Sequence, residues 1–169
     1  MSFRNKKLRG VEYDLSHLRA FEITVTPKAE AAPTFRVSVS FNSHVFTRDL
    51  AADDPPDLKY FDGREVRAFC VDRHALSIHL PNIIQNGTTG RAFFSEGRNF
   101  LLIEKMPGRV GPYAVFFNLE RARTGPADAK MFVVSAYEKP NLPSRLPKIT
   151  FATLVSKTVS GANITRPKK

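Results

Sequence analysis

The chain has 169 residues, 42% of them hydrophobic and 25% charged, which is enough for one domain with a buried core. Its single cysteine, Cys70, excludes an intramolecular disulfide and a cysteine-based metal cluster, and suits a reducing compartment. The sequence starts without the apolar run of a secretion signal. No stretch approaches the roughly eighteen apolar residues of a membrane span, so we expect a cytoplasmic protein.

The net charge of +10 is concentrated at the two ends of the chain. Each end carries four basic residues and no acidic one: Arg4, Lys6, Lys7 and Arg9, and Lys157, Arg166, Lys168 and Lys169. Residues 11–156 are left with 18 basic and 16 acidic side chains. We therefore predict a flexible basic arm (1–18), a single domain (19–156) and a flexible basic tail (157–169). Basic ends of this kind either bind nucleic acid without sequence specificity or only increase solubility.

Alternating apolar residues mark strands in the first half of the domain. The alternation runs through Phe21–Val25 and again through residues 35–41, whose other face carries Ser38, Ser40 and Asn42. A turn at Asn42-Ser43 would return residues 44–48 as a hairpin partner, with His44 on the polar face. The acidic, proline-containing residues 51–57 form a connector.

A strand followed by a helix is expected between residues 66 and 80. Residues 66–71 are apolar enough for a strand, and Asp72 is a good N-cap for a helix over 73–80. Pro81 either ends that helix or begins another turn.

The second half predicts four successive strands, at residues 91–95, 99–104, 113–120 and 130–137, joined by turns rich in glycine and proline. Residues 149–158 suit a helix or a strand almost equally. The predicted fold is therefore α+β: a four-stranded antiparallel meander packed against short helices, with an additional N-terminal β-hairpin.

Several enzyme classes lack their motifs in this sequence. It contains no phosphate-binding loop of the Gly-x-x-x-x-Gly-Lys-Ser/Thr or Gly-x-Gly-x-x-Gly type, and no Gly-x-Ser-x-Gly turn. His74 and His79 are five apart, whereas zinc ligands that stack on one helix face are three or four apart. We expect no cofactor and no metal.

The last predicted strand carries polar residues in phase. Ser135 and Tyr137 are two apart, so they point to the same face of a strand, and Lys139 follows in the same phase. The two hydroxyls could simply cap the edge of a sheet. A Ser/Tyr/Lys row can also hold a phosphate or take part in proton transfer.

Metal-free cleavage of RNA is the chemistry that these residue types support. Attack by the 2′-hydroxyl needs a base, a positive charge at the phosphate and an acid at the leaving oxygen. The candidate catalytic residues are His44, His74, Ser135 and Tyr137, and the candidate phosphate contacts are Arg73, Arg91, Arg98 and Lys139. We expect His79 to be structural, and the adjacent phenylalanine pairs Phe93-Phe94 and Phe116-Phe117 to belong mostly to the core rather than to a base-stacking surface.

The order of elements and the segment Val-Val-Ser-Ala-Tyr-Glu-Lys (133–139) resemble the bacterial ribonuclease toxins that include barnase, EndoU-type, colicin-D-type and RelE-type domains. The resemblance covers roughly residues 65–140. It implies roles for Ser135 and Tyr137 on the last core strand, with His44 and His74 as upstream histidines. The whole chain also resembles uncharacterised bacterial proteins labelled as stationary-phase growth adaptation proteins.

Three functions remain open at this point. The first is a metal-independent endoribonuclease of toxin type, whose basic ends raise its encounter rate with RNA. The second is a non-catalytic nucleic-acid-binding or adaptor domain. The third is a partner-binding protein that docks another protein, such as a neutralising antitoxin, through a sheet edge and the Pro140–Pro147 segment.

Overall fold

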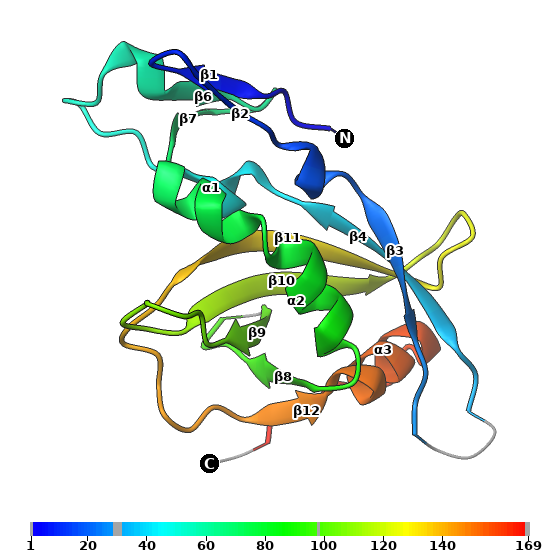
Figure 1. Ribbon diagram of the computed structural model, residues 1–169. Coiled ribbons are helices and arrows are strands. Elements are labelled where there is room, and N and C mark those ends of the chain that lie inside the picture. The colour runs from blue at the N-terminus through cyan, green and yellow to red at the C-terminus, as the bar shows by residue number, and fades with distance from the viewer. Residues whose placement is uncertain (1, 29–31, 98, 168–169) are drawn as a thin grey trace.

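The structure is a computed structural model that describes residues 2–28, 32–97 and 99–167. It is an α+β fold made mostly of strands (Figure 1). Its elements in chain order are β1 (Lys6–Leu8), β2 (Val11–Tyr13), η1 (Ser16–Leu18), β3 (Phe21–Val25), β4 (Phe35–Phe41), η2 (Ser43–Val45), β5 (Thr47–Arg48), η3 (Pro56–Leu58), β6 (Lys59–Phe61), β7 (Val66–Phe69), α1 (Val71–Ser77), α2 (Leu80–Gly87), β8 (Arg91–Phe94), β9 (Phe100–Glu104), β10 (Tyr113–Arg121), β11 (Ala129–Glu138), β12 (Lys148–Thr150) and α3 (Phe151–Ser160).

The main sheet has seven strands in the order β12-β8-β9-β10-β11-β4-β3. Its neighbouring strands are antiparallel, except that β4 and β11 are parallel and pair Val37 with Ala129. The prediction of a four-stranded antiparallel meander is therefore wrong for the sheet as a whole. The four expected strands form as β8 to β11, but β12 extends one edge and β4 and β3 extend the other.

The predicted hairpin between residues 35–41 and 44–48 does not form. The Asn42 side chain accepts a hydrogen bond from the backbone N–H of His44 at 3.3 Å, which caps the 3₁₀-helix η2 and turns the chain out of the sheet. Strand β5 then joins a separate sheet of order β5-β7-β6. The hairpin found at the N-terminus is β1–β2 instead, a two-stranded antiparallel pair.

Helices α2 and α3 pack against the same face of the main sheet, here called the core face. Val115 and Phe117 of β10 are two apart and point to it. Phe117 meets Phe151 of α3 with ring centroids 5.9 Å apart. Leu102, the β9 partner of Val115, lies directly under Gly87 of α2. The other face of the sheet, here called the outer face, carries Phe116.

A bulge in β11 decides which of its side chains reach the outer face. Phe117 pairs with Val133 and Phe116 pairs with Ser135, so Val134 is the extra residue. Beyond the bulge, Ala136 is buried in the core while Ser135 and Tyr137 are half-buried. Both pair with β10 residues of the outer face, which confirms that they share a face.

The sequence did not distinguish between a helix and a strand for residues 149–158. In the structure these residues contribute to β12 and then to α3. Helix α3 begins at Thr150, whose hydroxyl accepts a hydrogen bond from the Thr153 N–H. It ends at Gly161 in the left-handed conformation (φ 73°). Lys157, expected in a flexible tail, therefore lies in the last turn of α3.

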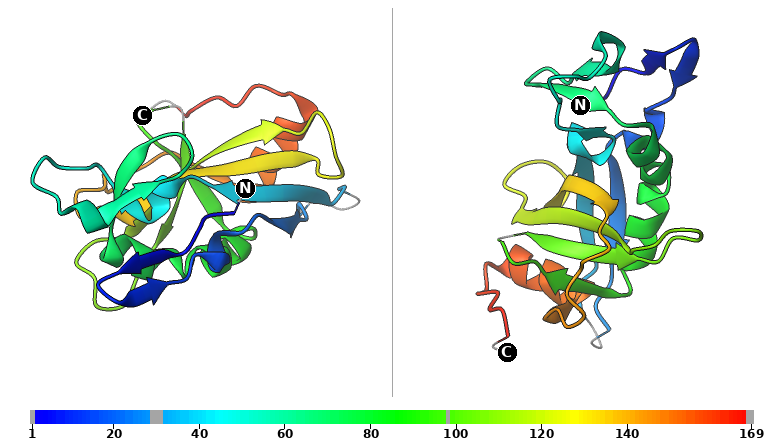
Figure 2. Two further views of the ribbon diagram at one scale, coloured as in Figure 1. Left: turned by 90° about the horizontal axis from the view of Figure 1, so that it is seen from above. Right: turned by 90° about the vertical axis from the view of Figure 1, so that its left-hand side faces the viewer.

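The N-terminal segment, expected as a flexible arm, is packed into the fold. Leu8, Leu15 and Leu18 are buried, and the carbonyl oxygen of Arg4 accepts a hydrogen bond from the Tyr60 hydroxyl at 2.9 Å. Figure 2 shows that this segment lies with β6 and β7 at one end of the molecule. No helix within the described ranges is long and apolar enough to cross a membrane.

His17 makes the packing of this segment sensitive to acid. Its Nε2 lies 2.8 Å from the Ser77 hydroxyl, and burial, followed by the proximity of His74, lowers its pKa. Below about pH 6.5 the unfolded chain therefore binds more protons at this position than the folded chain, so stability is complete above that pH and falls as the pH drops through it.

We expect the melting temperature to fall between about pH 7.5 and pH 5.5, and His17→Asn to reduce that fall. Thermal unfolding followed by circular dichroism across this range measures it. His79→Asn, at an exposed position, is the matched control. Equal pH dependence in wild type and His17→Asn would contradict the assignment.

Candidate functional site

Five side chains gather where β11 ends on the outer face: Arg73, Phe116, Ser135, Tyr137 and Lys139. We call them the β11 cluster. The Tyr137 ring stacks on Phe116 with centroids 5.5 Å apart and planes inclined by 22°. The Arg73 guanidinium lies over the Tyr137 ring, 5.0 Å from its centroid, and the Lys139 ammonium lies 5.9 Å from the centroid of Phe116. Two cations thus flank a stacked aromatic pair.

Arg73 is held in place by the backbone of the segment before it. One of its terminal nitrogens, Nη1, donates to the carbonyl oxygens of Thr47 at 2.6 Å and His44 at 3.2 Å. Its other N–H groups form no hydrogen bond within the described part of the chain. The guanidinium is therefore fixed by one end while the remaining donors stay available for an anion.

Arg109 fastens helix α1 to the end of β11. It contacts Asp72 at 2.6 Å and Glu138 at 3.5 Å. These two acidic residues directly precede Arg73 and follow Tyr137 in the sequence. The bridge therefore fixes the separation between the guanidinium and the phenol of the cluster.

The two hydroxyls of the cluster are free within the described residues. Neither Ser135 nor Tyr137 has a side-chain hydrogen bond there, and both are half-buried. Tyr113 differs, because its hydroxyl is fully buried without a partner and burial raises its pKa. A fully buried phenol on the core face has no access to a ligand, whereas the Tyr137 phenol is half-buried on the outer face.

His44 adjoins the cluster through its backbone carbonyl, and its ring is hydrogen-bonded to Glu65. Its Nε2 is 2.7 Å from the Glu65 carboxylate. An ionised carboxylate only accepts hydrogen bonds, so Nε2 carries a proton, and in the neutral ring the lone pair is on Nδ1. The side chain is 29% exposed. The His44–Glu65 pair is therefore half-exposed, and the contact of Arg73 with the His44 carbonyl joins it to the cluster.

Three predicted site residues are not part of this arrangement. His74 is buried, donates to the Asp14 carbonyl at 2.9 Å and packs edge-on against Tyr13, so its ring takes part in the packing of the N-terminal segment. His79, expected to be structural, is exposed. Arg91 lies on β8, three strands from β11 and about 14 Å from it at ordinary strand spacing. Arg98 lies outside the described residues.

A pocket of about 300 Å³ adjoins the cluster. We call it the loop pocket, because the segment that follows Lys139 folds over the outer face and forms its wall. Phe116 and Lys139 belong both to the pocket and to the β11 cluster, Leu101 adds an apolar surface, and Asn99 and Asn141 add side-chain amides. The volume is at the lower end of the range for small-ligand sites.

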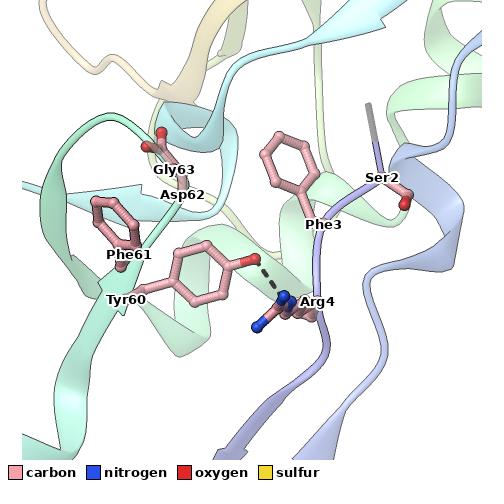
Figure 3. A pocket seen from close by; sticks show the side chains of 7 residues that line it. All are labelled: Ser2, Phe3, Arg4, Tyr60, Phe61, Asp62 and Gly63. Atoms are coloured by element: carbon pink, nitrogen blue, oxygen red, sulfur yellow. Dashed lines mark hydrogen bonds between the residues drawn. The ribbon is translucent and has the colours of Figure 1, made fainter.

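A second hollow, of about 280 Å³, lies between the N-terminal segment and β6 (Figure 3). Two of its polar side chains are already engaged: the Tyr60 hydroxyl donates to the Arg4 carbonyl, and Asp62 accepts from the Ser43 hydroxyl at 2.6 Å. Phe3 and Tyr60 both pack edge-on against Phe46. This hollow therefore lies where the N-terminal segment packs against the β6 region. No group of three or more metal-ligating side chains occurs in residues 2–28, 32–97 and 99–167.

Sequence reasoning missed two residues of the site. Phe116 was assigned mostly to the core, because adjacent phenylalanines on a strand face opposite sides and both sides were expected to be covered. Glu65 gives no signal in the sequence, since its contact with His44 depends on the turn between β6 and β7.

Comparison with known proteins yields one match. The model of the YjaZ family matches residues 5–159, which includes every element from β1 to β12 and nearly all of α3. Neither the curated proteins nor the solved structures gave a match. Because the matched range is most of the 169 residues, the chain belongs to the YjaZ family.

Proposed function

We propose that this protein is an endoribonuclease that needs no metal and cleaves RNA by attack of the 2′-hydroxyl, as toxin-type ribonucleases do. The observation that carries the proposal is the β11 cluster: a free phenol and a free serine hydroxyl between two cations, beside a histidine–carboxylate pair. Groups of these types can bind a phosphate and transfer protons.

Each residue has a distinct part in the proposed reaction. The Nδ1 lone pair of His44 takes the proton of the 2′-hydroxyl as its oxygen bonds to phosphorus. The bond from phosphorus to the 5′-oxygen breaks, and the Tyr137 phenol gives that oxygen a proton. Arg73 and Lys139 neutralise the charge that builds on the phosphate, and Ser135 donates a hydrogen bond to one of its oxygens. The products are a 2′,3′-cyclic phosphate and a 5′-hydroxyl.

The loop pocket would hold one base of the substrate. Its Phe116 and Leu101 surfaces suit stacking, and the amides of Asn99 and Asn141 can hydrogen-bond to a base edge. Lys139 lines the pocket and also belongs to the cluster, so a base in the pocket would place its phosphate near the two hydroxyls.

Incubation of total bacterial RNA in EDTA with wild type and with the Ser135→Ala/Tyr137→Phe double variant tests the proposal. We expect fragments with cyclic phosphate ends from wild type only, because the double variant lacks both hydroxyls. End chemistry is read by resistance to a ligase that needs a 3′-hydroxyl. Ser38→Ala/Tyr13→Phe removes the same groups elsewhere and is the matched control. Intact RNA with folded wild type would contradict the proposal.

The second candidate is RNA binding without cleavage. One observation favours it: the His44 ring is directed at Glu65 rather than at the cluster hydroxyls. The outer face still offers half-buried Phe116, Phe132 and Tyr137 for stacking. This candidate predicts RNA retention that falls steeply with salt, no fragments, and a loss of affinity in Tyr137→Ala that Tyr137→Phe does not show.

A further inference from the structure

A wide basic groove lies at the opposite end of β10 and β11 from the β11 cluster. It has a volume of about 650 Å³ and runs between the end of β10, the start of β11 and the C-terminal turn of α3. Four cations line it, Arg121, Arg123, Lys130 and Lys157, with a single carboxylate, Glu120. Figure 1 shows these three elements together, away from the N-terminal end of the molecule.

The local fold explains why the groove is open. Pairing between β9 and β10 stops at Phe100 and Phe117, and among the described residues only β11 pairs with residues 118–121 of β10. Within that part of the chain, no strand lies on the β9 side of this stretch of β10. Helix α3 ends at Gly161 beside the same stretch, and Lys157, whose ammonium donates to the Asn163 carbonyl at 3.4 Å, lines the groove.

The groove keeps a net positive charge. None of its four cations lies within 4.0 Å of a carboxylate in the described part of the chain. Glu120 offsets one of them, since it sits opposite Lys130 in the strand register. The C-terminus of α3 adds only about half a negative charge, and its carbonyls already accept from the N–H groups of Gly161 and Ala162. Uncompensated cations of this kind favour a polyanion.

We propose that the basic groove binds the phosphate backbone of single-stranded nucleic acid, at a site separate from the β11 cluster. Lys130 and Tyr137 are seven residues apart on β11, about 24 Å at strand spacing. A bound strand can therefore reach from the groove to the cluster. This inference rests on the proposed function in one respect only, namely that the bound strand is RNA.

Fluorescence anisotropy with a labelled 20-nucleotide RNA and a DNA of the same sequence tests the groove. We expect Arg121→Gln/Arg123→Gln/Lys157→Gln to weaken binding at low salt by at least about tenfold and to reduce the slope of log K against log salt by about 2. Lys7→Gln/Arg19→Gln/Lys59→Gln removes three exposed cations elsewhere and should stay within about twofold of wild type. Glu120→Gln should tighten binding.

The outcomes separate this inference from the proposed function. Loss of binding in the groove variant with no cleavage by wild type keeps the groove and overturns the enzyme. Cleavage by wild type with unchanged RNA affinity and salt slope in the groove variant overturns the groove. DNA binding equal to RNA supports recognition of phosphate alone. If polyglutamate displaces the labelled RNA as well as unlabelled RNA does, the nucleic-acid proposal is overturned in favour of an acidic protein partner.

Discussion

Arg73→Met should give the largest loss of cleavage of any single substitution in this chain, about 10³-fold in kcat/KM. Methionine keeps an unbranched stem against the Tyr137 ring but removes the charge and every donor. The guanidinium is expected to stabilise charge on the phosphate, and removal of one such donor alone costs about 10²–10³-fold in other enzymes. Loss of its fixed position relative to Tyr137 adds to this.

The same substitution should also destabilise the fold. The carbonyl oxygens of His44 and Thr47 lose their donor, and unsatisfied groups in such positions cost about 1–3 kcal/mol. Arg73→Lys restores the charge but not the planar fork, so we expect an intermediate rate. Cleavage is measured well below the melting temperature of each variant, with Arg19→Met, at an exposed position, as the control. If folded Arg73→Met cleaved RNA within threefold of the wild-type rate, Arg73 would not belong to the proposed site.

The polar row on β11 was predictable because it depends on period-two geometry alone. Ser135 and Tyr137 lie after the bulge at Val134, so the extra residue shifts both and leaves their common face intact. The prediction would have failed for two residues of which one lies before the bulge and the other after it. Lys139 keeps the same phase just past the end of the strand.

The histidines were harder to predict because short helices give a weak periodicity. A single helix over residues 73–80 puts His79 beside a packed leucine, but the chain forms two helices that meet at Ile78–His79. This break exposes His79 and buries His74. His44 was expected on the polar face of a strand over residues 44–48, but only Thr47–Arg48 form a strand, and His44 lies in η2, where the chain leaves the main sheet.

Strand order explains where Arg91 lies and why the main sheet differs from the expected meander. Arg91 lies at one side of the sheet because β9 and β10 separate β8 from β11. The sequence of residues 35–41 and that of residues 129–138 each predict a strand. Neither shows that the two strands pair in parallel although they are far apart in the chain. Long-range pairing of this kind is set by the packing of the whole core, which local patterns do not encode.

Gly111→Ala should give the largest loss of stability among the glycine substitutions considered, about 3 kcal/mol. An added Cβ would lie 2.6 Å from the Pro140 Cα and 2.7 Å from the Pro140 nitrogen. Both are backbone atoms, so no side-chain rotation relieves the contact. The two segments must separate, which breaks the bonds from Gly111 N–H to Glu138 and from Lys139 N–H to the Pro112 carbonyl.

Gly87→Ala is the matched control for this effect. Its added Cβ would lie 2.9 Å from a methyl carbon of Leu102, the flexible end of a side chain. Alanine also favours a helix over glycine by up to about 1 kcal/mol. We expect its net change to stay within about 1 kcal/mol, measured by urea unfolding of both variants. If Gly111→Ala were as stable as wild type, the segments around Gly111 and Pro140 could move apart without loss of stability, which would contradict the prediction. Because Lys139 moves with Pro140, the same displacement should also lower cleavage at temperatures where Gly111→Ala is folded.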